Sequence, residues 1–110
     1  MKPRVYLILL ALTEGDLHGL GIARAVEEMS DSRVRLWPAT LYGTLDDLVT
    51  TGWIQELDDP RSRPAGESEK KRFYRLTPVG RRALASETER LAAVVKLAKS
   101  RLKPRTGSVA

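Results

Sequence analysis

The chain has 110 residues, no cysteine and a single histidine, His18, so its length suits one domain, and disulfides, thiolate metal sites and histidine-built metal sites are excluded. The formal net charge of +5 is unevenly spread, because residues 1–57 carry five Lys/Arg against eight Asp/Glu and residues 58–110 carry fourteen against six. A basic half can neutralise the phosphates of a nucleic acid, although a solvated helix face has the same composition.

The first 30 residues predict two helices. Arg4–Thr13 is apolar on almost every side, so a helix there must be buried on most faces. Its apolar run, Val5 to Leu12, has eight residues, whereas a bilayer requires roughly 20. No cleavage signal follows this run, so we expect a cytoplasmic protein with no membrane partner. After the turn at Gly15, the second predicted helix is Leu20–Met29.

A third helix is predicted to begin at Trp37-Pro38. Proline suits the first helical turn because no hydrogen-bond donor is lost there, and the residue before proline avoids the helical conformation. The helix carries an apolar stripe that should face the core, and Gly52 is its expected C-terminal stop. The stripe consists of Leu41, Leu45, Leu48 and Val49.

The second half predicts a hairpin and a long helix. Trp53–Leu57 and Lys71–Leu76 are aromatic and β-branched enough to form strands, and the charged stretch 58–70 between them predicts a long hairpin loop. Thr77-Pro78 is a specific helix start, with a capping threonine before a first-turn proline. We expect a helix from Pro78 to about Leu102, and a disordered tail at 104–110.

The order helix, helix, helix, hairpin, helix is that of a winged helix-turn-helix. The predicted fold class is mainly α with a small β-hairpin wing (α+β). We expect a DNA-binding domain at 1–78, a C-terminal dimerisation helix at 79–103 and the tail at 104–110. A charged loop of this length is unusual in a compact domain, and a wing that contacts DNA explains it.

Three segments together resemble the PadR-like family of transcriptional regulators, in order and spacing over about residues 5–85. They are His18-Gly19-Leu20-Gly21-Ile22, then Pro38-Ala39-Thr40-Leu41-Tyr42 through Leu45, Leu48 and Gly52-Trp53-Ile54, and lastly Arg72 through Gly80 with Leu84. The resemblance implies a dimeric repressor, often relieved by a small hydrophobic ligand, with a single C-terminal dimerisation helix in the shorter members. The sequence departs from the family pattern at Ala39, where a glycine is usual, and at Gly43 and Asp47, where basic residues are common.

The start of the third helix is the expected recognition element, because the second helix of a helix-turn-helix enters the major groove with its N-terminal residues. Its candidate DNA contacts are Thr40, Tyr42 and Thr44, although Tyr42 could equally be a partly buried packing residue. Residues 39–51 contain two aspartates and no Lys or Arg, so this helix contributes no electrostatic attraction. Arg33 and Arg35, just before it, are expected to compensate in part.

Most of the electrostatic attraction is therefore expected from the hairpin. Long basic side chains there can lie along phosphates or enter a narrow minor groove, whereas the alternative is a salt-bridged surface loop. The candidate residues are Arg61, Arg63, Lys70, Lys71 and Arg72.

Along the last helix, apolar residues recur at intervals of four and three, the spacing of a coiled-coil seam. A helix of about 25 residues spans roughly 37 Å and extends beyond a bundle this small, so we expect it to pair with a second copy of the chain. Twofold symmetry would then predict a palindromic DNA site. The candidate dimerisation residues are Leu84, Leu91, Val95, Ala98 and Leu102, with Thr88 in the same seam.

No catalytic residue, cofactor or metal is predicted. His18 lies beside Gly19 at a turn, where a local capping role is expected, and Gly19-Leu20-Gly21 lacks the third glycine and the preceding strand of a dinucleotide loop. An effector pocket is expected between the long helix and the helix-turn-helix, near Trp37 or Trp53. The rival hypothesis is a dimeric winged-helix protein-interaction module that has lost DNA binding.

Overall fold

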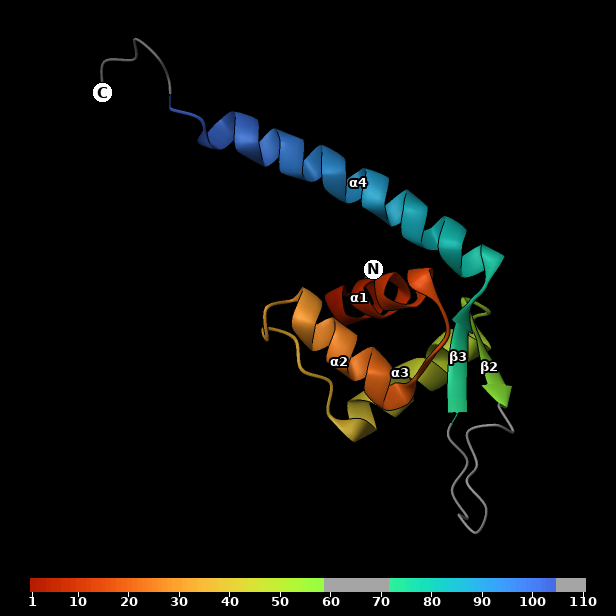
Figure 1. The fold of residues 1–110 in the computed structure, drawn as a ribbon. Helices are drawn as coiled ribbons and strands as arrows, with labels where there is room; N and C mark the ends of the chain where they lie inside the picture. Colours follow the sequence, from red (N-terminus) through yellow and green to blue (C-terminus); the bar gives the residue numbers. More distant parts are fainter. Residues whose placement is uncertain (59–71, 105–110) are drawn as a thin grey trace.

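A computed structural model describes residues 1–58 and 72–104 (Figure 1). Its elements are α1 (Pro3–Ala11), the 3₁₀ turn η1 (Leu12–Glu14), β1 (Leu17–His18), α2 (Gly19–Met29), α3 (Pro38–Thr50), β2 (Ile54–Asp58), β3 (Arg72–Leu76) and α4 (Pro78–Leu102). The predicted fold class is confirmed, since helices predominate, the sheet is small and antiparallel, and α4 is long. The predicted tail at 104–110 lies, apart from Pro104, outside the described residues.

The helix starts follow the local chemistry that the sequence predicted. α3 and α4 each begin at their proline, and the Thr77 hydroxyl accepts a hydrogen bond from the backbone amide of Gly80 at 3.0 Å. His18 caps α2, because its Nδ1 accepts a hydrogen bond from the amide of Gly21 at 3.0 Å. The expected local role of this histidine is therefore confirmed.

The sheet contains a strand that was not predicted. Among the described residues it has three strands in the order β1-β3-β2, all antiparallel. β1 consists of two residues, with Leu17 opposite Tyr74 and His18 opposite Phe73. In the hairpin itself, the pairs run from Ile54 opposite Leu76 to Asp58 opposite Arg72. Since β3 is central, it anchors the hairpin to the start of α2.

A single hydrophobic core lies between the first three helices and the inner face of the sheet. Its members are buried to 9% exposure or less, and Tyr74 is its largest side chain at 1%. Burial raises the pKa of the Tyr74 phenol above its ordinary value. The core residues are Ile8, Leu9, Leu12, Ile22, Val26, Leu41, Leu45, Leu48, Ile54, Tyr74, Leu76 and Leu84.

The start of α4 is fixed against the turn between α3 and β2. The Thr77 hydroxyl donates to the Gly52 carbonyl at 2.6 Å, and the Thr77 amide donates to the Trp53 carbonyl at 3.1 Å. Gly80 lies so close to the backbone of Trp53 that a Cβ on Gly80 would collide with the Trp53 carbonyl, and it would lie 2.9 Å from Cδ1 of Leu76. Only glycine fits at this contact.

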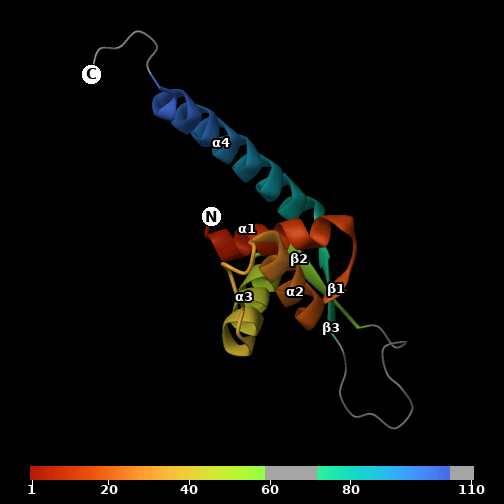
Figure 2. The ribbon, with the colours of Figure 1, turned by 60° about the vertical axis from the view of Figure 1, so that its left-hand side comes forward.

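Beyond its first turns, α4 leaves the body of the molecule (Figures 1 and 2). Gly80 and Leu84 are its buried residues. A 2.7 Å hydrogen bond between the Tyr6 and Thr88 hydroxyls joins α4 to α1 there. No helix in the described parts, 1–58 and 72–104, is both long enough and apolar enough to span a bilayer.

Candidate nucleic-acid interface

Three element ends lie on one side of the molecule, which we call the lower face. They are the N-terminal ends of α2 and α3 and the open end of the β2–β3 hairpin, at Asp58 and Arg72. Figures 1 and 2 both show these ends at the bottom, whereas the C-terminal end of α4 lies on the opposite side. The fold therefore presents the start of the predicted recognition helix and the hairpin in the same direction.

The three candidate contacts on α3 have different surroundings. Thr40 is exposed, and Tyr42 is 46% exposed with its ring lying over Gly19, where an added Cβ would be 2.7 Å from the Tyr42 hydroxyl. Thr44 is only 7% exposed. Its hydroxyl donates to the Thr40 carbonyl at 2.7 Å and accepts from Nε of Arg4 at 3.3 Å. Thr44 thus faces α1, so we remove it from the candidate base contacts.

The outward surface of α3 is acidic and open. Asp46 and Asp47 are exposed, and a Cβ built on Gly43 meets no atom within 4 Å. Gly43 lies opposite the buried Leu41 and Leu45, near the middle of the outward surface. The absence of positive charge on this helix, noted from the sequence, is therefore a property of its solvent-facing side.

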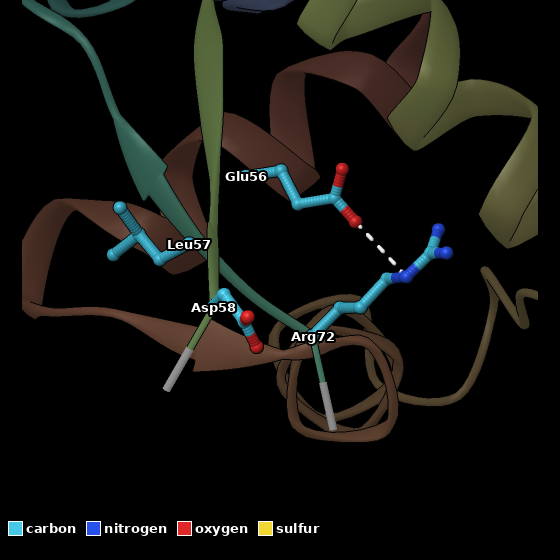
Figure 3. Close-up of a pocket in the computed structure, with 4 residues that line it drawn as sticks. All are labelled: Glu56, Leu57, Asp58 and Arg72. Carbon is cyan, nitrogen blue, oxygen red and sulfur yellow. Dashed lines mark ion pairs between the residues drawn. The ribbon is translucent and has the colours of Figure 1, made fainter. Parts of the chain in front are cut away.

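The flanking and hairpin cations are partly engaged with acids. Arg35 pairs with Glu27 through Nε at 3.0 Å, and Arg72 pairs with Glu56 through Nε at 3.1 Å. Figure 3 shows this pair, with Nε of Arg72 facing the Glu56 carboxylate, and both residues line a hollow of about 280 Å³. The Arg35 and Arg72 side chains nevertheless remain 61% and 62% exposed, so both can still reach a ligand.

Of the other flanking and hairpin cations, one lies in the described part of the chain. Arg33 is exposed in the connection between α2 and α3. The remaining four hairpin cations lie outside the described residues, and they are Arg61, Arg63, Lys70 and Lys71.

Two long-range polar contacts that the sequence did not reveal position the lower face. Arg75 on β3 forms a bidentate pair with Asp16, through Nε at 3.0 Å and a terminal nitrogen at 2.8 Å. These hydrogen bonds lower the pKa of the Asp16 carboxyl, and the pair joins the hairpin to the turn before α2. Arg4 similarly joins α1 to α3 through Thr44. The partners are separated by 59 and 40 residues, so no local pattern indicates them.

The predicted seam on α4 divides into two parts. Leu84 is 6% exposed and belongs to the core of its own protomer, so its assignment to a dimer contact is corrected. Leu91 is half-buried, whereas Val95, Ala98 and Leu102 are exposed. Val94 and Leu97 add two more apolar side chains, 51% and 49% exposed, to this outer half.

An ion cluster lies where α4 leaves the body. Glu87 accepts two hydrogen bonds from Arg90, each 2.8 Å long, and lies 3.4 Å from the N-terminal amine of Met1. The Arg90 hydrogen bonds, with the positive charges of Arg90 and the amine, lower the pKa of Glu87 to about 2. The Glu87 side chain is 11% exposed. This cluster and the contact between Tyr6 and Thr88 tie α4 to α1.

Two shallow hollows lie on the surface of the first helices. One, of about 440 Å³, lies between α1 and α2. The other, of about 340 Å³, is lined by α2 and by the connection that ends at Trp37, and no residue of α4 contributes to it. Within residues 1–58 and 72–104, no group of three acidic, histidine or cysteine side chains is placed to hold a metal.

Comparisons with known proteins agree with this architecture. The sequence model of the "Transcriptional regulator PadR-like family" matches residues 8–86. An uncharacterized 37.1 kDa transposon protein of Streptomyces fradiae is 37% identical over 86 residues, which are 78% of this chain and 22% of the relative. The chain therefore spans about a fifth of the length of that curated relative.

Solved structures share the fold along most of the chain. A transcriptional regulator from Clostridium thermocellum has a TM-score of 0.73 at 25% identity, over 91% of this chain and 90% of its own. A PadR family transcription regulator from Clostridium difficile has a TM-score of 0.76 at 20% identity, over 93% and 100%. PadR of Bacillus subtilis, solved in complex with operator DNA, has a TM-score of 0.67 at 22% identity, over 99% and 53%. The last two likenesses concern the fold alone.

Proposed function

The chain belongs to the PadR-like family of transcriptional regulators, and from that premise we propose that it binds double-stranded DNA as a homodimer and represses transcription at a palindromic operator. The observation that carries the proposal is the lower face, where the start of α3 and the open end of the hairpin point the same way (Figures 1 and 2). A helix end can enter the major groove while the hairpin follows the adjacent backbone. The operator-bound PadR of B. subtilis has the same fold, which supports this proposal.

Dimerisation is proposed through the outer half of α4. The apolar side chains of Val94, Val95, Leu97 and Leu102 are 49–81% exposed on a helix that projects from the body. A contiguous apolar surface of this kind marks an association site. Residues 1–78 would then form the DNA-binding unit, and residues 79–103, with Leu91 and Ala98 in the seam, the dimerisation helix.

The chemistry of the lower face indicates how affinity is divided. Because α3 carries Asp46 and Asp47 and no cation, Thr40 and Tyr42 are proposed to contact DNA as neutral hydrogen-bonding groups. Attraction to phosphates is assigned to Arg33 and Arg35 and to the hairpin cations, Arg61, Arg63, Lys70, Lys71 and Arg72. Two copies in a dimer double each contact. A small hydrophobic effector that relieves repression completes the proposal.

The acidic surface of α3 favours one alternative, a dimeric protein-interaction module that has lost DNA binding. Gel-shift titrations with duplexes that cover the DNA upstream of the protein's own gene separate the two functions. Repressor function predicts retardation that weakens steeply between about 50 and 200 mM salt, since bound phosphates release counterions. No retardation of any duplex at the lower salt concentration would favour the interaction module.

A further inference from the structure

Trp37 has an exposed indole at a position where a small polar side chain would accept a hydrogen bond from a free backbone amide of the helix. It is the N-cap of α3, yet its side chain makes no capping hydrogen bond, and it is 70% exposed. Serine, threonine, aspartate or asparagine at this position would stabilise the helix end, whereas tryptophan contributes no cap and leaves a large apolar ring in water. Local folding therefore does not account for this residue.

The indole borders a hollow that combines apolar and basic groups. The hollow has a volume of about 340 Å³, and Leu20, Ala23, Arg24, Glu27, Arg35, Leu36 and Trp37 line it. Leu20 is 53% exposed, and Arg24 is exposed as well. The carboxylate of Glu27 is engaged by Arg35. An apolar floor with two guanidinium groups at its margin suits a ligand that is flat or apolar in one part and anionic in another.

We propose that this surface, defined by Leu20, Arg24, Arg35 and Trp37, is a DNA-contacting site at the margin of the major groove, an inference that rests on the proposed DNA binding. The indole ring would lie against a deoxyribose or a thymine methyl group, and its Nε1–H can donate to a phosphate oxygen. Arg24 and Arg35 would hold the phosphates on either side.

DNA is favoured as the occupant for two reasons. The surface is continuous with the lower face, since Trp37 is the residue immediately before α3 and Leu20 is the second residue of α2. Its arginines also supply the positive charge that α3 itself lacks, and phosphates are the complementary groups. A protein partner, which an exposed tryptophan can also bind, is the alternative outcome of the test.

The test compares Trp37→Ala, Trp37→Phe and the control Val79→Ala, an exposed apolar residue on the first turn of α4. Gel shifts with duplexes from upstream of the protein's own gene should show about a tenfold loss of affinity for Trp37→Ala, a ratio equivalent to about 1.4 kcal/mol, and none for Val79→Ala. The chain has two tryptophans, so the difference between wild type and Trp37→Phe isolates the Trp37 fluorescence. We expect duplex DNA to quench that component.

The outcomes distinguish this inference from the proposed function. The inference would be overturned, while DNA binding stands, if wild type and Trp37→Ala bound a duplex with equal affinity and if duplex DNA quenched the fluorescence of wild type and Trp37→Phe equally. The exposed indole would then be assigned to a protein partner. No retardation of any duplex by the wild type would overturn the proposed function together with the inference. Because Trp37 is mostly in solvent, neither substitution should alter the thermal unfolding midpoint by more than about 2 °C.

Discussion

Substitutions at Gly43 test the orientation of α3 without disturbing the core. The position is inside the helix, its φ is not positive, and a built Cβ has no neighbour within 4 Å. Glycine within a helix costs roughly 0.5–1 kcal/mol relative to alanine, because it loses more backbone entropy on folding. Gly43→Ala should therefore raise the free energy of unfolding by about that amount, which corresponds to about 2–8 °C in Tm for a domain of this size.

Gly43→Lys should stabilise the protein nearly as much as Gly43→Ala, since lysine is almost as good a helix former as alanine, and it also adds a positive charge. If each new lysine meets one phosphate, the slope of log K against log salt should steepen by about 0.9 per copy, or about 1.8 for a dimer. Gly43→Ala is the matched control, because it changes the helix and leaves the charge unaltered. Thermal unfolding measures the first effect, and gel shifts over a series of salt concentrations measure the second.

The two readouts can fail separately. Equal salt slopes for Gly43→Lys and Gly43→Ala would show that a cation at the middle of the outward surface of α3 lies out of reach of the phosphates, which would contradict the placement of this surface in the major groove. A lower Tm for Gly43→Ala would instead refute the structural argument that the position is open.

Three further predictions concern other parts of the structure. Gly80→Ala should lower the free energy of unfolding by about 1–3 kcal/mol, because the added methyl group meets the Trp53 carbonyl; a Tm equal to that of the wild type would contradict this contact. Glu87 has a pKa of about 2 in the folded state, below the ordinary glutamate value of 4.5, so its stabilising contribution is present above pH 4.5 and lost as the pH falls toward 2. Glu87→Gln should flatten the loss of Tm over this range, and an unchanged pH profile would count against the ion cluster. Thr40→Ala should weaken DNA binding without changing Tm, whereas Thr44→Ala should lower Tm. If Thr44→Ala instead weakened DNA binding at an unchanged Tm, Thr44 would return to the candidate base contacts.

Local sequence signals predicted most of the fold because the helices carry their own start and stop chemistry. Pro38 and Pro78 are the first residues of α3 and α4, as predicted, and the predicted end of α4 at Leu102 is confirmed. β1 was missed because two residues are too few to show a strand pattern and their pairing with β3 spans more than 50 residues. The end of α1 was placed too late, since the chain tightens into a 3₁₀ turn after Ala11.

The candidate site was harder to predict than the fold because residue type and burial disagree at several positions. Thr44 is polar, but it is three residues after Leu41 and four before Leu48, so helical periodicity places it on the inward side. Leu84 follows the spacing of the seam, yet its own protomer covers it. From the sequence, Trp37 was noted as part of the start of the third helix and as a neighbour of a possible effector pocket, and its exposure, which carries the further inference, is visible only in three dimensions.

The central claim is that two copies of α3 are held one DNA turn apart, and a distance between the copies tests it most directly. Because the chain has no cysteine, Gly43→Cys provides a single spin-label site in open space on the outward side of α3. Pulsed electron paramagnetic resonance on the labelled protein should give a distance between the two labels centred near about 34 Å, the spacing of adjacent major grooves on one side of a duplex. The absence of coupling between labels, or a distance that matches no whole number of DNA turns, would contradict the account.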